Sequence, residues 1–221
     1  MTRLTGRLGE VEVCALEPGA VRPEGGADVE AALVVLTGTV SGLGEGDARH
    51  LPPGAPADLV AGAEGARLLI VRVPATGGPR PRGAGDTGEA GPRPGRAGDT
   101  GEASAQVLAA GGGFADMRVR WLVSGAATGS TGLVVATSTF APDGHHELHR
   151  HPHAEEFFLV VEGSGEHLTG SGPVRLGPGD IVLVAAGERH GYRTDAGVTT
   201  RTVYGYLGAA GLDSAGYEVC P

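Results

Sequence analysis

Short apolar runs separated by glycine and proline are the feature that most constrains how this chain can fold. Before residue 75 they read EVEVCALE, EAALVVLTGTV and ARLLIVRV; beyond residue 104 they read MRVRWLVSG, GLVVATSTF, EEFFLVVEG, DIVLVAAG and VTTRTVYGYL. Runs of this length, bounded by turn-forming residues, are typical of strands. With 41 glycines and 15 prolines in 221 residues, the chain is predicted to be all-β, with strands at the spacing of a sandwich or barrel.

A near-perfect tandem duplication divides the chain into two parts. The 13-residue segment GPRPRGAGDTGEA (78–90) is followed directly by GPRPGRAGDTGEA (91–103), and neither copy contains a large apolar residue. Such a segment buries too little surface to offset the entropy lost on ordering it. We therefore expect residues 75–104 to be a disordered Gly/Pro/Arg-rich linker between a first β domain (1–74) and a second (105–221).

Charge and hydropathy argue against several classes of partner. The formal net charge is −9 and no Lys/Arg cluster lies outside the linker, so neither a nucleic acid nor a membrane is expected to be a partner. No apolar run approaches the ~18 residues of a membrane span, and the N-terminus resembles no secretory signal. We expect a cytoplasmic protein in which Cys14 and Cys220 are reduced thiols.

Histidine is concentrated in the stretch GHHELHRHPHAEEFFLVVEG, which begins at Gly144 and holds five of the eight histidines. On a strand, alternate side chains share one face, so His149 and His151 are expected to project together. The two carboxylates that follow lie on opposite faces, and we favour Glu156 over Glu155 as the partner of these histidines.

His190, 34 residues after Glu156, completes a set of three imidazoles and one carboxylate. This set suits a divalent transition metal such as Fe(II), Zn(II), Mn(II), Ni(II) or Cu(II). An octahedral ion held by so few protein ligands keeps positions open for substrate, water or O₂, whereas a structural site is more often tetrahedral and contains cysteine. The competing interpretation is a solvated His-rich loop that binds metal only adventitiously.

The same residues resemble the two sequence motifs of the cupin superfamily. The first motif runs Gly, five residues, His-x-His, three or four residues, Glu, six residues, Gly, and is similar to the stretch from Gly144 to Gly163. GDIVLVAAGERH (179–190) resembles the second motif. Three departures affect turns rather than ligands: one residue fewer after Gly144, Ala185 in place of the usual Pro, and Thr194 in place of the usual Asn.

The resemblance implies a jelly-roll barrel over residues 105–221, with metal ligands at His149, His151, Glu156 and His190. The first half is similar in form but lacks the ligands. Aligning Gly38 with Gly163, and Gly54 with Gly187, places at the four ligand positions Glu24, Gly26, Ala31 and Ala57. We therefore expect a bicupin, with two tandem cupin-type jelly-roll barrels of which the N-terminal one is degenerate; a monomer and a homodimer are both compatible with this.

Similarity to cupins also implies a function. It suggests an enzyme with one divalent metal, Fe(II) being favoured, that acts on a small chelating organic substrate by dioxygenase-like oxidation or C–C cleavage. The alternatives are a non-redox isomerase, lyase or polyketide-type cyclase with the metal as Lewis acid, and a non-catalytic ligand-binding cupin.

Several side chains near the expected metal are candidates for the chemistry. Glu156 and Tyr192 are the candidates for moving a proton, because Tyr192 shares the parity of His190. The candidates for holding the substrate are Arg120, Phe158, Arg201 and Tyr204.

The remaining histidines are assigned no direct role in binding the metal. We expect His145, His146 and His153 at the surface or at the mouth of the site. His50 and His167 are expected to be exposed residues without partners.

Overall fold

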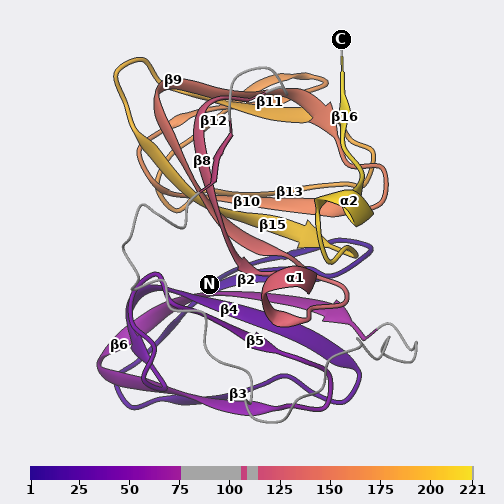
Figure 1. The fold of residues 1–221 in the computed structure, drawn as a ribbon. Coiled ribbons are helices and arrows are strands. Elements are labelled where there is room, and N and C mark those ends of the chain that lie inside the picture. The colour runs from indigo at the N-terminus through magenta and orange to yellow at the C-terminus, as the bar shows by residue number, and fades with distance from the viewer. Residues whose placement is uncertain (76–105, 109–113, 221) are drawn as a thin grey trace.

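The computed structural model describes residues 1–75, 106–108 and 114–220, and these residues form two β-barrels that lie one above the other (Figure 1). The all-β fold class is confirmed. Apart from Ala75, the expected linker lies outside the described residues. The two helices are single turns, α1 (Gly125–Thr128) and α2 (Leu212–Ala215). No helix in the described part of the chain is long and apolar enough to cross a membrane.

The first barrel, indigo to purple in Figure 1, is an antiparallel sheet of order β1-β2-β6-β4-β5, with β3 also paired to β6. The long strand β6 makes the curvature possible, because its first part pairs with β3 and its remainder pairs with β2 and β4. The strands are β1 (Thr2–Thr5), β2 (Glu10–Leu16), β3 (Val21–Glu24), β4 (Val29–Val40), β5 (Ala48–Leu51) and β6 (Ala57–Pro74).

The second barrel has the strand order β12-β11-β14-β9-β15-β10-β13, with β8 and β16 also paired to β9 and β7 paired to β8. The long strand β9 pairs with β8 and β15 in its first half and with β14 and β16 near its end. The strands are β7 (Gln106–Leu108), β8 (Phe114–Val123), β9 (Val135–Arg150), β10 (Glu155–Glu162), β11 (Gly165–Thr169), β12 (Gly172–Leu176), β13 (Ile181–Val184), β14 (His190–Thr194), β15 (Thr200–Leu207) and β16 (Glu218–Val219).

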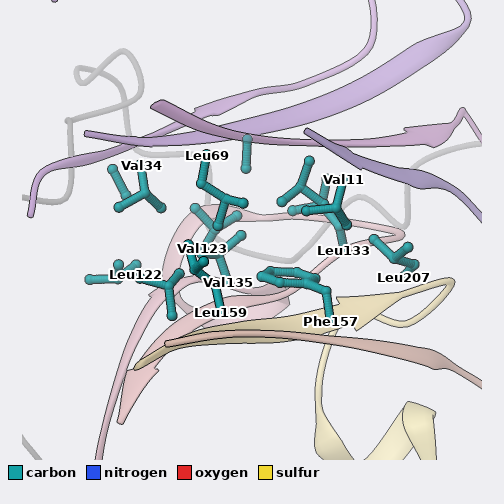
Figure 2. Packing of buried hydrophobic residues seen from close by; sticks show 14 of the residues in the cluster. Val11, Val34, Leu69, Leu122, Val123, Leu133, Val135, Phe157, Leu159 and Leu207 are labelled. Carbon is teal, nitrogen blue, oxygen red and sulfur yellow. The ribbon is translucent and has the colours of Figure 1, made fainter. Parts of the chain in front are cut away.

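The two barrels share one hydrophobic core between them (Figure 2). Val34 and Leu69 of the first barrel pack in the same cluster as Phe157 and Leu159 of the second, and all four are buried. The alternate residues of these strands face into the barrels; Phe158, for example, packs inside the second. Strands covered on both faces need apolar residues at successive positions, which explains the unbroken runs EAALVVL and EEFFLVV.

Two buried carboxylates add polar contacts across the same interface. Glu155 accepts hydrogen bonds from the backbone N–H groups of Arg7 (2.7 Å) and Leu8 (3.0 Å) in the first barrel. This contact places Glu155 on the face opposite to Glu156, as strand parity requires, and confirms that Glu155 points away from the histidines.

Glu30 makes the corresponding contact from the first barrel to the second. Its carboxylate accepts from the backbone N–H (2.9 Å) and hydroxyl (2.8 Å) of Thr131, and lies 2.7 Å from Nε2 of His50. The expectation that His50 is exposed and unpartnered is therefore wrong, since its side chain is only 5% exposed. Burial alone would raise the pKa of Glu30, but the bonds from His50 and Thr131 lower it to about 2.

Glu30→Gln should destabilise the protein by about 1–3 kcal/mol, because His50 and Thr131 lose the buried, charged carboxylate to which they are bonded. The folded-state pKa is depressed, so the carboxylate's contribution is complete above about pH 4.5 and is lost as the pH falls toward about 2. Urea unfolding across that range should show a flatter pH dependence for the variant than for the wild type. Glu17→Gln, at an exposed position, is the control; equal pH profiles for wild type and Glu30→Gln would contradict the assignment.

Candidate metal centre

Three histidines and one glutamate of the second barrel converge on one point. His149 lies near the end of β9 and pairs directly with His190 on β14; His151 follows β9 immediately, and Glu156 lies on β10. The nitrogen and carboxylate atoms that these residues offer lie within 4.8 Å of one another, and all four residues are buried. The structure thus brings together the four side chains that the sequence nominated.

In all three imidazoles the hydrogen bond is made by Nδ1, which leaves Nε2 directed at that point. Nδ1 of His149 donates to the Glu147 carbonyl (2.8 Å), and Nδ1 of His190 donates to the Glu188 carbonyl (3.0 Å). Nδ1 of His151 donates to the carbonyl of Gly216 (2.5 Å). A carbonyl only accepts, so each ring carries its proton on Nδ1 and directs the lone pair of Nε2 inward.

The inward nitrogens have no hydrogen-bond partner among the described residues, although they are buried. Nε2 of His151 and of His190 lie 3.0 and 3.3 Å from the Glu156 carboxylate, but neither forms a hydrogen bond with it. Buried polar atoms without partners are costly and call for a ligand. Three inward lone pairs and one carboxylate fit a divalent metal ion, and the cluster can hold one.

The buried groups of the cluster shift one another's pKa values. Burial, together with the neighbouring His190, lowers the pKa of His149 to about 3, so its ring is neutral at physiological pH. Burial alone would raise the pKa of Glu156, but His190 and His151 hold it well below its usual range. Burial also acts to lower the pKa of His190, and the Glu156 carboxylate outweighs this and raises it.

His146 lies against the centre, which strand parity did not predict. Its ring stacks on that of His149, with centroids 3.7 Å apart, and on Phe114 at 4.1 Å. The pairing of β9 with β14 shifts register between His190 and Tyr192, so one extra residue of β9 forms a bulge between His146 and His149. The bulge reverses the parity of β9 and turns His146 to the side of His149.

His167 is also buried, contrary to the expectation of an exposed residue. It is 4% exposed on β11, and its ring is parallel to that of His190 at a centroid distance of 6.2 Å. Burial, reinforced by His190, lowers the pKa of His167 to about 4. His153, by contrast, is exposed, as expected.

A cavity of about 130 Å³ opens beside the cluster inside the second barrel. Its wall includes Glu156 and His146, and the rest of the lining is mostly aromatic or aliphatic: Phe114, Met117, Trp121, Phe140, Phe158, Tyr204, Tyr206, Leu212 and Tyr217. Two of the nominated substrate-binding residues, Phe158 and Tyr204, are therefore at the cavity. The others in this wall include residues on β8 and in the C-terminal segment, which no motif marks.

Arg120 and Arg201 are not at this cavity, which corrects their assignment as substrate-binding residues. They line a different hollow of about 290 Å³, together with residues of the first barrel such as Val34. Arg201 also pairs with Glu162 at 3.3 Å. Strand parity gives the reason, since each arginine has the opposite parity to an inward aromatic residue on its strand, Trp121 on β8 and Tyr204 on β15.

Tyr192 is buried, but its hydroxyl does not reach the cluster. Its ring packs on Phe140 and Phe158, and the hydroxyl lies beside Gly165, where an added Cβ would be only 2.5 Å from it. Gly165 is at the opposite end of β11 from Thr169, the residue that pairs with His190. The side chain points along the barrel away from the histidines, so the structure gives no support to Tyr192 as a proton carrier.

The first barrel has equivalent strand pairs without the ligands. Among the described residues, no second cluster of potential metal ligands is found. The strand pairing gives the equivalent positions, which agree with the glycine alignment. The pair Glu156–Tyr206 of the second barrel corresponds to Ala31–Arg72 of the first. The pair His149–His190 corresponds to Glu24–Ala57.

Arg72 lies where the equivalent cavity would be. Its guanidinium makes two bonds of 2.5 Å to Glu24, and further bonds to Glu10 (2.7 Å) and Glu12 (3.0 Å). A hydrogen bond from Arg22 is the main cause that lowers the pKa of Glu12 to about 2. In this barrel a side-chain cation therefore neutralises the buried carboxylates.

Comparison with known proteins agrees with this geometry. Residues 136–203 match the family model described as "Cupin domain", and this segment contains all four converging residues. The second barrel therefore contains a cupin domain. A search of curated proteins gave no match.

Two solved structures superpose on nearly the whole chain and share its fold. An oxalate decarboxylase from Bacillus subtilis superposes with a TM-score of 0.63 at 15% identity, covering 99% of this chain and 77% of that chain. A "Cupin 2 conserved barrel domain protein" from Leptotrichia buccalis gives 0.60 at 10% identity, covering 93% and 87%. The polyketide cyclase RemF from Streptomyces resistomycificus is 25% identical over 47% of this chain and 72% of that chain, with a TM-score of 0.42.

His149→Ala and His190→Ala should each abolish stoichiometric metal binding while the barrel stays folded, because each removes one of three convergent nitrogens. Elemental analysis of protein loaded with one divalent metal and then desalted measures this, with circular dichroism as the check on folding. His153→Ala, which changes an exposed histidine in the same stretch, should retain about one ion per chain. Full metal occupancy in both cluster variants would refute the site.

Arg72→Leu should cost about 3–5 kcal/mol of unfolding free energy, because it removes the cation closest to the buried Glu24 and leaves that carboxylate with only Arg22, at 3.5 Å. The double variant Arg72→Leu/Glu24→Leu should recover part of this loss, since it removes both partners of the closest pair. Arg67→Ala, at an exposed position of the same strand, should change stability little. Urea unfolding of these variants, the wild type and Glu24→Leu decides, and effects of the two single variants that add up in the double variant would show that Arg72 and Glu24 are not coupled.

Proposed function

We propose that this chain is a metal-dependent enzyme that acts on a small, largely apolar organic substrate whose oxygen atoms bind the metal. The observation that carries the proposal is the aromatic cavity that ends at Glu156 and adjoins the histidine cluster. A pocket with an apolar wall and a few convergent polar groups is the usual form of a small-molecule site.

The composition of the wall supports a ring-containing substrate. Phe158 and Trp121 offer flat apolar surfaces, and no lysine or arginine is among the described residues that line the cavity. A small dicarboxylate would leave its second charge without a partner in such a wall. The oxalate decarboxylase is therefore a relative in fold, and we propose a different substrate class for this chain.

The proposed chemistry divides between a metal and the surrounding phenols. A bound divalent ion supplies a Lewis acid that polarises and orients the substrate oxygens. Burial raises the pKa of Tyr204 and of Tyr206, and burial is the main cause that raises the pKa of Tyr217 to about 12. All three phenols therefore keep their protons at neutral pH and can donate hydrogen bonds to substrate oxygens, and the Glu156 carboxylate in the same wall can accept a proton.

Two reaction classes fit this arrangement. The first is oxidation or C–C cleavage that consumes O₂, with Fe(II) as the metal; the largely apolar wall of the cavity suits it. The second is non-redox isomerisation, elimination or cyclisation with a metal such as Zn(II) or Mn(II), and the protonated tyrosines favour it. Mn(II) centres are named in a solved oxalate decarboxylase of the same fold.

We also propose a division of roles between the barrels. The second barrel would bind one small-molecule substrate and one metal ion. The first would hold no metal, because Arg72 already neutralises its buried carboxylates, and would serve as the packing partner that covers β10 and β15.

Oxygen uptake separates the two reaction classes. The Fe(II)-loaded protein, prepared without air, is mixed with catechols, flavonols and 1,3-diketones in an oxygen-electrode cell, and the products are analysed by mass spectrometry. The first class predicts O₂ consumption matched to product, which is lost in His190→Ala. Product formed by the Zn(II)- or Mn(II)-loaded protein without O₂ consumption would establish the second class. Binding without turnover of any compound would contradict an enzymatic role.

A further inference from the structure

We infer that Leu212–Val219, which we call the C-terminal strap, determines specificity at the metal centre by closing the cavity, and positions His151 for the metal. The inference rests on the proposed function and extends it to residues outside the cupin motifs. The strap consists of α2, Gly216, Tyr217 and β16.

Backbone pairing anchors the strap on both sides of the His149–His151 pair. Strand β16 pairs with the end of β9, where Val219 lies opposite His149 and Glu218 opposite Arg150. Beyond it, the backbone N–H of Cys220 donates to the carbonyl of Leu148 (2.8 Å). On the other side, the backbone N–H of His153 donates to the carbonyl of Ala215 (3.0 Å).

The Gly216 carbonyl fixes the ring of His151. The Nδ1 partners of His149 and His190 are carbonyls only two residues away along the chain. His151 instead depends on a carbonyl 65 residues along the chain. Gly216 has a φ of 75°, and an added Cβ would lie 2.9 Å from Cδ of Pro152, so the carbonyl reaches His151 only because this residue is glycine.

Two side chains of the strap form part of the cavity wall. Leu212 packs against the aromatic cluster inside the barrel, and Tyr217 lies beside the histidines, with its ring centroid 5.1 Å from that of His149. The Tyr217 hydroxyl is hydrogen-bonded to Nε2 of His146 (3.2 Å). A substrate bound at the metal therefore meets strap residues at one end of the cavity, and their size limits its length.

The first part of the test measures the binding of Zn(II) without any substrate. Gly216→Ala should weaken the binding of Zn(II) by about 10- to 100-fold, the usual effect of losing the partner of a metal-binding histidine. Competition with a chromophoric chelator gives the dissociation constant, and circular dichroism checks folding. Gly211→Ala is the matched control, because its added Cβ meets no atom within 4 Å, and it should bind Zn(II) as the wild type does.

The second part measures a ring-containing probe in the Zn(II)-loaded protein. 4-Nitrocatechol presents two adjacent oxygens, and its visible absorption changes when they bind a metal. Leu212→Phe should raise the dissociation constant for 4-nitrocatechol at least 10-fold and leave that for Zn(II) unchanged, because it narrows the cavity without touching the cluster. Asp213→Asn, at an exposed position of the same helix, should change neither constant.

The outcomes distinguish the inference from the function on which it rests. A wild-type protein that binds no Zn(II) would overturn the proposed function. In another outcome, the wild type binds Zn(II) and 4-nitrocatechol, and Gly216→Ala and Leu212→Phe bind both as the wild type does. That result would refute the role inferred for the strap but not the metal centre. We expect a selective pattern, in which Gly216→Ala weakens the binding of Zn(II) and Leu212→Phe weakens only the binding of 4-nitrocatechol.

Discussion

The function proposed for this chain depends on three imidazole rings whose proton positions are fixed from behind. Each Nδ1 donates to a backbone carbonyl, so each Nε2 presents a lone pair to the same buried point beside the Glu156 carboxylate. Without a cation this arrangement leaves three buried nitrogens unsatisfied. The barrel supports the geometry by pairing His149 directly with His190 and by placing Glu156 on a strand buried on both faces.

The two barrels handle the same internal position in opposite ways. In the second barrel, three imidazole nitrogens and one carboxylate together attract a divalent ion. In the first, Arg72 bonds Glu24 at the position equivalent to His149, and the buried charges neutralise one another. The shared apolar core and the carboxylates Glu30 and Glu155 then hold the barrels together.

The long buried strands and the four converging residues could be predicted from the sequence, because apolar runs and the spacing of the histidines follow strand periodicity directly. Short strands such as β3 and β12 could not, since they carry proline and charged residues and most of their side chains stay out of the core. A bulge in β9 turns His146 toward His149, which regular alternation along a strand would not predict. Tyr217 and Gly216 reach the site through tertiary pairing of a segment without any motif. Arg120 and Arg201 lie outside the cavity because each has the opposite parity to an inward aromatic residue on its strand.

The central claim is that three imidazoles and one carboxylate surround a single ion, and X-ray absorption at the metal edge tests it most directly. Protein loaded with one equivalent of Zn(II) should give a first shell of nitrogen and oxygen at about 2.0–2.2 Å. The outer scattering should have the amplitude of three imidazole rings. A spectrum with only oxygen neighbours and no imidazole scattering would contradict the account.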